Sequence, residues 1–200
     1  MTRGQRFARL VTDIVVRRPM LWRIFRRRLT AQFDKLAPVW DSMRMPDTLA
    51  PIEAALDRVA SPARRVLDLG TGTGAVARLV ADRFPGADVA GADIAAQMIQ
   101  EARRLTDSSR ITYQVADAQN LPFADGSFDL ITLGNMIPFF DELARLVASG
   151  GHVIVAYSAG PETPIYVAPE RLRSELGRRG FTEIAELSAG RGSAVLAAKG

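Results

Sequence analysis

The feature that most constrains the fold of this chain is a turn with three alternating glycines. The turn, Gly70-Thr71-Gly72-Thr73-Gly74, follows the short apolar segment Val66–Leu69 and precedes an amphipathic stretch that begins at Ala75. Glycine tolerates positive φ angles and, having no Cβ atom, lets the backbone approach a ligand closely. A buried strand, such a turn and a helix together open an α/β unit. We therefore expect a sheet whose first strand ends at this turn.

Short apolar segments and amphipathic segments alternate as far as residue 157. Strands are expected at Val66–Leu69, Asp88–Ala92, Ile111–Val115, Phe128–Leu133 and Val153–Tyr157. Helices are expected between them at Ala75–Phe84, Ala95–Leu105 and Asp141–Val147. Strands that are separated by helices pair in parallel through right-handed crossovers. The pattern predicts an α/β fold with a Rossmann-like, doubly wound, mostly parallel sheet.

The last part of the sequence has a different pattern. After a helix expected at Pro169–Leu176, strands at Phe181–Leu187 and Ala194–Ala198 are joined by the short connection Gly190-Arg191-Gly192. A connection this short joins antiparallel neighbours. We therefore expect an antiparallel hairpin at one edge of the sheet.

The composition excludes several kinds of chemistry. The 200 residues suffice for one full-sized domain, and 48% of them are hydrophobic. There is no cysteine, which excludes disulfides, thiolate zinc sites and a cysteine nucleophile. The single histidine, His152, excludes a multi-histidine metal site, so no metal is expected. We expect His152 at the start of the fifth strand, away from the ligand edge, in a structural role.

The first 60 residues form a basic arm that differs from the rest. Residues 1–44 carry ten arginines and one lysine against three aspartates, a net charge of +8, whereas the whole chain carries +4. Apolar residues recur at helical spacing after Pro19, at Trp22, Phe25, Leu29, Phe33 and Leu36, and a further helix is expected from Asp47. We divide the chain into a helical arm or lid, 1–60, and a ligand-binding domain, 61–200.

Three roles of the basic arm remain open. The first is a lid over the site whose arginines are solvated, and the second is a helix that contacts an anionic membrane surface. A nucleic-acid clamp is the least favoured, because no RNA-binding module accompanies the charge. No apolar run approaches the roughly 20 residues of a membrane span, and no signal peptide is apparent. We expect a cytoplasmic protein, peripheral at the membrane in the second role; the sequence carries no signal for an oligomeric state.

The glycine turn alone fits a dinucleotide. Gly70, Gly72 and Ala75 match the pattern G-x-G-x-x-G/A, and Asp93 follows at the distance expected of a ribose contact. This match supports a nicotinamide-dependent oxidoreductase as one alternative.

Three other features favour an adenosyl amino acid. Asp68 precedes the turn, and its carboxylate suits an ammonium group and repels a pyrophosphate. Asp117 and Ala118 follow the third strand, where a carboxylate and a backbone N–H can meet the edge of an adenine. The antiparallel hairpin is not part of the usual dinucleotide domain.

Four segments carry a family resemblance: VLDLGTGTG (66–74), VAGADIAAQMI (89–99), VADAQNLPFADGSFDLI (115–131) and GGHVIVAY (150–157). In this order they resemble the class I S-adenosylmethionine-dependent methyltransferases, and among these the small-molecule group that includes the ubiquinone and menaquinone biosynthesis methyltransferases. Phe33–Asp41 is similar to the opening motif of that group, with Trp40 where a tyrosine is usual. The resemblance implies a seven-stranded sheet whose last strand is antiparallel.

The resemblance also implies S-adenosylmethionine as the cofactor and assigns contacts with it. Those toward the methionine part and the sulfonium are Asp68, Gly70, Gly72, Gly74, Gly134 and Asn135. Those toward the ribose and the adenine are Asp93, Ile94, Met98, Asp117 and Ala118. Asp68 would face the ammonium and Asp93 both ribose hydroxyls.

Methyl transfer from a sulfonium is an in-line displacement in which alignment supplies much of the acceleration. Many acceptors need no general base, so the reaction type identifies no catalytic residue. Asn135, Asp141, Tyr157 and Ser158 are candidates to touch an acceptor because of their position in the chain. The leading hypothesis is a methyltransferase that acts on a small molecule. In one form of this hypothesis the acceptor is lipid-like or quinone-like. A non-catalytic protein that binds an adenosyl ligand is the further alternative.

Overall fold

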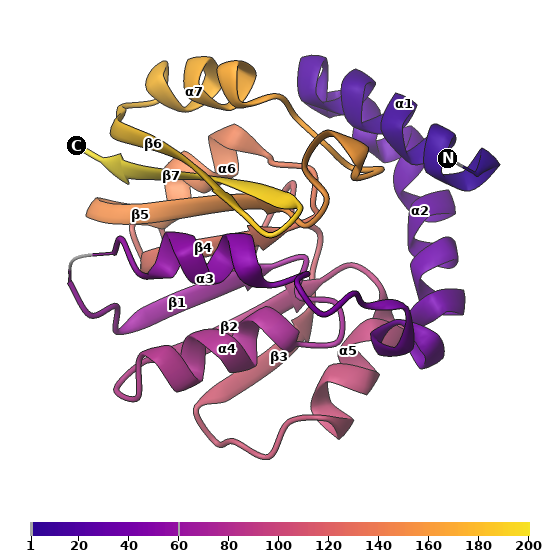
Figure 1. Cartoon of the computed structure of the whole chain (residues 1–200), viewed down its shortest axis with the longest axis horizontal. Coiled ribbons are helices and arrows are strands. Elements are labelled where there is room, and N and C mark those ends of the chain that lie inside the picture. Colours follow the sequence, from indigo (N-terminus) through magenta and orange to yellow (C-terminus); the bar gives the residue numbers. More distant parts are fainter. Residues whose placement is uncertain (1, 60) are drawn as a thin grey trace.

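The computed structural model describes residues 2–59 and 61–200, and its centre is a seven-stranded sheet (Figure 1). The strands are β1 (Arg65–Leu69), β2 (Asp88–Asp93), β3 (Ile111–Val115), β4 (Phe128–Gly134), β5 (Val147–Tyr157), β6 (Phe181–Ala189) and β7 (Gly192–Lys199). Their order across the sheet is β3-β2-β1-β4-β5-β7-β6. β7 runs antiparallel to both of its neighbours, whereas β3, β2, β1, β4 and β5 pair in parallel. The predicted fold class, including the hairpin, is confirmed.

Helices cover both faces of this sheet. They are α1 (Arg3–Arg17), α2 (Trp22–Leu36), α3 (Ala50–Leu56), α4 (Ala75–Arg83), α5 (Ala96–Arg104), α6 (Phe140–Leu146) and α7 (Pro169–Gly177). Short 3-10 turns lie at η1 (Pro19–Leu21), η2 (Ala37–Val39), η3 (Asp41–Met43) and η4 (Gly160–Glu162). α3 and α4 share one face of the sheet, and α6 and α7 share the other.

Two hydrophobic layers result because neighbouring side chains of a strand point to opposite faces. On β4, Leu130 packs in the same layer as Val80 of α4. The next residue, Ile131, packs in the other layer, together with Leu143 of α6. The four side chains are completely buried, so the sheet that carries the site is a rigid platform.

The segment predicted as the basic arm packs in two different places, and the change comes after residue 49. α1 and α2 lie beside the carboxyl ends of the parallel strands, at the right of Figure 1. Asp34 of α2 accepts a hydrogen bond from the backbone N–H of Gln97 (2.9 Å), so the arm caps the first turn of α5. α3 instead packs against β5, β6 and β7. Within the described residues, no helix combines the length and apolar character that crossing a membrane requires.

Two boundaries differ from the sequence prediction. Asp47 does not cap a helix: α3 begins at Ala50, and the Asp47 carboxylate accepts the backbone N–H of Arg191 in the β6–β7 turn (3.1 Å). β5 begins at Val147, six residues before the predicted start. Its pairing with β4 shifts register there, and Gly150 adopts a φ of 74°. The strand therefore continues through an irregularity at this glycine.

Candidate functional site

A cavity of about 780 Å³ lies between the carboxyl ends of the strands and the basic arm. Its walls on the sheet side include Asp68, Leu69, Gly70, Thr71, Gly72, Ala92, Asp93, Ile94, Met98, Ala116, Ala118, Gly134, Asn135 and Met136. Its walls on the arm side include Trp22, Leu29, Gln32, Phe33, Leu36, Trp40, Met43 and Arg44. The volume is within the range of small-molecule sites, and the position is the one at which doubly wound sheets bind ligands.

The glycine turn borders this cavity with its first two glycines. Gly70 and Gly72 have φ angles of 70° and 54° and belong to the cavity wall. A Cβ atom added at Gly70 would lie 2.7 Å from the sulfur of Met136, whereas one added at Gly72 would meet only Trp40, at 3.6 Å. Gly72 is therefore the point at which the backbone faces open space in the cavity.

The third glycine has a different function. Gly74 has a φ of 80° but does not line the cavity, and an added Cβ atom would overlap the hydroxyl of Tyr113. The turn needs a glycine here because Tyr113 of β3 packs over it. Gly74 lies outside the cavity wall, and its contact with the methionine part of the cofactor stays a prediction.

Asp68 is a buried carboxyl at the end of β1 and belongs to the cavity wall. It accepts hydrogen bonds from the hydroxyls of Thr71 (2.6 Å) and Thr132 (2.9 Å). Its residue is 1% exposed. Burial raises the pKa of Asp68 to about 6, and the two hydroxyls oppose that rise only in part. A buried carboxyl of this kind gains from a nearby cation, because a positive charge favours its ionised form.

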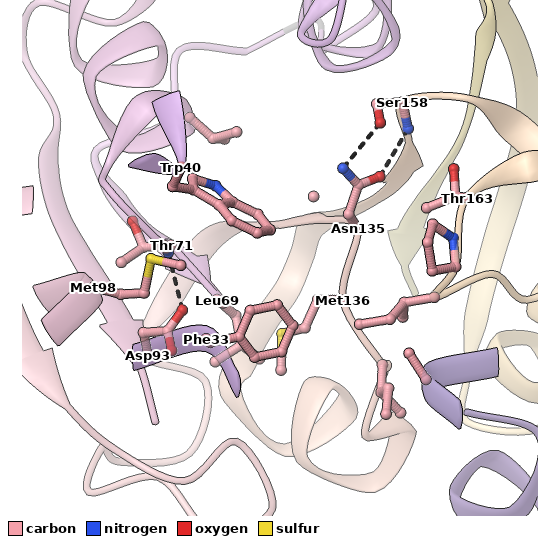
Figure 2. A pocket seen from close by; sticks show the side chains of 18 of the residues that line it. Phe33, Trp40, Leu69, Thr71, Asp93, Met98, Asn135, Met136, Ser158 and Thr163 are labelled. Carbon is pink, nitrogen blue, oxygen red and sulfur yellow. Dashed lines mark hydrogen bonds between the residues drawn. The ribbon is translucent and has the colours of Figure 1, made fainter. Parts of the chain in front are cut away.

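Asp93 ends β2 and organises the neighbouring loops. Its carboxylate accepts the backbone N–H of Gly72 (3.0 Å) and the backbone N–H of Ala95 (2.8 Å). Burial raises the pKa of Asp93. Figure 2 shows Asp93 on one side of the cavity with Thr71 and Met98, facing the indole ring of Trp40. Ile94 and Met98 also line the cavity, so three of the residues expected at the cofactor, with Asp93, lie along one wall.

Asp117 departs from its predicted position. It is absent from the cavity wall, and its two oxygens accept hydrogen bonds from Trp22 Nε1 (2.8 Å) and from Arg26 (2.7 Å), both on α2. Asp117 therefore fastens the arm, a contact that local sequence patterns around residue 117 do not reveal. Its neighbour Ala118 lines the cavity as expected.

The end of β4 forms the opposite wall. Gly134 and Asn135 line the cavity, and Asn135 has a φ of 52°, which is uncommon for a residue other than glycine. Its amide exchanges two hydrogen bonds with Ser158: Asn135 Nδ2 donates to Ser158 Oγ (3.0 Å), and the Ser158 N–H donates to Asn135 Oδ1 (2.8 Å). Figure 2 shows this pair across the cavity from Asp93. The strained backbone is thus held by the loop that follows β5.

The other position-based candidates lie elsewhere. Tyr157 is 1% exposed and packs against Tyr166, and Asp141 is paired with Arg179 on the surface. His152 lies on β5 beside a separate, smaller cavity, and desolvation lowers its pKa. His152 is absent from the wall of the larger cavity, but it lies within β5 and not at its start as predicted, and its structural role stays a prediction. Among residues 2–59 and 61–200, no three His, Cys, Asp or Glu side chains form a metal-binding group.

Sequence reasoning missed most of the arm's contribution to the site. Phe33 and Trp40 form an edge-to-face pair (5.7 Å between ring centroids) that borders the cavity. Asp41 anchors this segment, because it accepts a hydrogen bond from the hydroxyl of Thr73 (2.5 Å) in the glycine turn. The resemblance of Phe33–Asp41 to a family motif was the available signal, but spacing alone does not show that this segment meets the turn.

A family model described as a methyltransferase domain matches residues 66–151. The chain is 38% identical over 113 residues to a demethylmenaquinone methyltransferase of Thermus thermophilus. The aligned region covers 52% of this chain and 50% of that protein. It is 32% identical over 157 residues to a ubiquinone/menaquinone biosynthesis C-methyltransferase of Geobacter sp. (strain M21). This aligned region covers 70% of this chain and 66% of that protein. The chain therefore spans about half to two thirds of these curated relatives.

Solved structures show the same fold at lower identity. A phosphoethanolamine N-methyltransferase 2 of Haemonchus contortus, solved with S-adenosyl-L-methionine, superposes with a TM-score of 0.67 at 19% identity, over 83% of this chain and 57% of that chain. A SAM-dependent methyltransferase from Aquifex aeolicus gives a TM-score of 0.64 at 17% identity, over 84% and 97%. None of these similarities supports the nicotinamide alternative. The family match, the relatives and the shared fold agree with the order of the four sequence motifs along the chain. The chain belongs to the class I S-adenosylmethionine-dependent methyltransferase family.

Proposed function

We propose that this protein transfers the methyl group of S-adenosylmethionine to an apolar small molecule of lipid-like or quinone-like character. The observation that carries the proposal is the continuity of one cavity. It joins the polar wall around Asp68 and Asp93 to an apolar wall, and the apolar side chains are Trp22, Leu29, Phe33, Met136, Ile137, Phe139 and Ile165. A polar cofactor and an apolar acceptor can therefore meet inside one cavity.

The polar wall fits the cofactor. Asp93 uses its oxygens for two backbone N–H groups and has further acceptor capacity for a ribose diol. Asp68 offers a buried negative charge to the amino-acid ammonium. Trp40 and Met98 belong to one apolar cluster on the same side of the cavity, which offers an apolar surface to the adenine (Figure 2).

When bound, S-adenosylmethionine supplies a methyl group activated by the sulfonium. The chain's own contribution is then alignment and the exclusion of water. The arm closes the cavity and is held by Asp117 and by Asp34. Asn135, fixed by Ser158, lines the cavity wall across from Asp93. Asp68 and Asp93 would hold the cofactor by its ammonium and its ribose, so that its methyl group would face an acceptor in the same cavity.

The acceptor class is supported by the relatives. The curated relatives named above carry names that refer to demethylmenaquinone and to ubiquinone or menaquinone biosynthesis. Such acceptors join a small polar ring to an apolar tail. An apolar wall lined by Phe139 and Ile165 suits a molecule of this shape better than it suits a charged metabolite.

Isothermal titration with S-adenosylmethionine, S-adenosylhomocysteine and NAD tests the cofactor. We expect both adenosyl ligands to bind and NAD not to bind. Asp93→Ala removes charge-assisted hydrogen bonds to the ribose, so the Kd for the adenosyl ligands should rise about 10- to 100-fold. Asp107→Ala is the matched control, because Asp107 is an exposed carboxylate outside the cavity.

The outcomes separate the alternatives. Binding of NAD in preference to the adenosyl ligands would contradict the proposal. Asp93→Ala must retain the circular dichroism of the wild type, and Asp93→Asn provides a smaller change in case it does not. Incubation of the loaded protein with reduced quinones that have short apolar tails, followed by mass spectrometry, then tests transfer. Cofactor binding without a methylated product from apolar acceptors would leave a binding protein and refute the acceptor class.

A further inference from the structure

The bend between α1 and α2 carries a patch of exposed basic and apolar side chains. We call it the bend patch, and it consists of Arg17, Arg18, Met20, Arg23, Ile24, Arg27 and Arg28. Met20 is 73% exposed and Ile24 is 69% exposed, the two highest values among the large exposed apolar residues of the described chain. Large apolar side chains exposed next to one another in a soluble fold mark an interaction surface.

The charge of the bend patch is not neutralised within the chain. None of its five arginines forms an ion pair with another described residue, whereas the neighbouring Arg26 is paired with Asp117. Arg28 lies over the ring of Phe7, 4.2 Å from its centroid, and this contact keeps its positive charge at the surface. The patch therefore offers five positive charges to an external partner.

The chemistry of the patch favours one kind of partner. A single-stranded nucleic acid would use the arginines but would also need exposed aromatic rings for its bases, and a duplex offers no apolar environment to Met20 and Ile24. The aromatic rings of the arm point inward instead: Phe7 packs on Phe25, and Trp22 packs on Phe139. A second copy of the same patch would be repelled by its own charge. A bilayer with anionic headgroups accepts both features, because it attracts arginines and takes up apolar side chains at its interface.

We propose that the bend patch docks the protein on the surface of an anionic phospholipid bilayer. Arg23 and Arg27 contact headgroup phosphates, and Met20 and Ile24 insert into the interface. The same helix faces the cavity with Trp22, Leu29 and Phe33, so docking brings the cavity wall next to the bilayer. If the acceptor is apolar, which rests on the proposed function, docking holds the protein at the phase in which that acceptor dissolves.

Vesicle cosedimentation of the full chain tests the docking. The vesicles are phosphatidylcholine alone, or phosphatidylcholine with roughly a third of phosphatidylglycerol as the anionic lipid. We expect binding to the anionic vesicles that weakens as salt rises, and little binding to the neutral ones. Arg23→Gln/Arg27→Gln should lower the partition coefficient about 30-fold, because each basic residue near an anionic surface contributes about a fivefold factor.

Two further variants sharpen the result. Met20→Gln/Ile24→Gln should also lower partition while the charge is unchanged. Arg58→Gln/Arg65→Gln is the matched control, because it removes the same charge from exposed positions with no side-chain ion pair, near the start of β1. It should leave partition within about twofold of the wild type, since charges beyond a Debye length of the surface contribute little.

The proposal fails if neutral and anionic vesicles bind equally, or if the control loses as much partition as the bend-patch variants. It also fails if a single-stranded oligonucleotide binds more tightly than the anionic vesicles, which would make the patch a nucleic-acid clamp. Titration with S-adenosylhomocysteine keeps the two proposals apart. None of the four substituted bend-patch residues lines the cavity, so their variants should bind this ligand like the wild type whether or not they dock.

Discussion

Replacing Asp68 with asparagine should stabilise the ligand-free protein at neutral pH while weakening its binding of a cationic ligand. The side chain is buried, and its pKa of about 6 in the folded state compares with an ordinary value of 3.8. Between these two values the folded chain holds a proton that the unfolded chain has released. Ionisation of Asp68 therefore lowers stability as the pH rises, and the loss is complete above pH 6.

The magnitude follows from the difference between the two pKa values. A gap of about 2 units corresponds to about 3 kcal/mol at pH 7.5 and to about 1 kcal/mol at pH 4.5. Asparagine avoids this loss but weakens the hydrogen bonds with the hydroxyls of Thr71 and Thr132, at a cost of about 1 kcal/mol. We therefore expect Asp68→Asn to be about 2 kcal/mol more stable than the wild type at pH 7.5 and about equal to it at pH 4.5.

Urea unfolding of the ligand-free proteins at both pH values measures this difference, with Asp107→Asn as the exposed control. A difference that is the same at pH 4.5 and pH 7.5, or a variant that is less stable at pH 7.5, would refute the reasoning. Ligand binding gives an independent check. Asp68→Asn should weaken S-adenosylhomocysteine but not methylthioadenosine, which lacks the amino-acid ammonium. Equal losses for both ligands would mean that Asp68 does not face that group.

Two further substitutions test the packing around the site. Gly74→Ala should cost about 2–5 kcal/mol, because the added Cβ atom meets Tyr113 and the φ of 80° is unfavourable for alanine. Urea unfolding measures the cost, and Gly86→Ala, where an added Cβ atom meets nothing within 4 Å, should be nearly neutral. Asp117→Ala should cost about 1–2 kcal/mol, mostly through the lost acceptor of Trp22 Nε1, because the half-exposed Arg26 pair is screened by solvent. Faster amide hydrogen exchange in α2 should accompany that loss, and unchanged exchange would show that Asp117 does not fasten the arm.

The local sequence pattern predicted most strands of the sheet well, because the apolar segment and the turn residues that mark each strand lie next to one another in the chain. β1, β2, β3 and β4 are apolar segments with clear turn signals, and each lies within two residues of its predicted bounds. The start of β5 was missed because Gly150 and Gly151 are typical of a turn. Their place in the sheet depends on the shifted pairing with β4, and the sequence of β5 alone carries no signal for that pairing.

The candidate site likewise combines residues whose position the sequence predicted with contacts that it did not predict. Asp68 and Asp93 lie at the ends of β1 and β2, and Asn135 directly follows β4. These strands run parallel, so the meeting of the three residues at one edge of the sheet is a consequence of topology. The contacts of Asp117 with Trp22 and of Asp34 with Gln97 join positions far apart in the chain. Such contacts depend on how the arm crosses the sheet, and neither helical periodicity nor residue type determines that path.

The position of β7 has a consequence for the order in which the protein can fold. β7 follows β6 in the chain but lies between β5 and β6 in the sheet. During synthesis, the free edge of β5, with apolar Val153 and Val155, has no partner until residues 192–199 have left the ribosome. An unpaired strand edge is a template for aggregation. In the nascent chain this edge of β5 therefore stays without its final partner until the strand made after β6 inserts beside it.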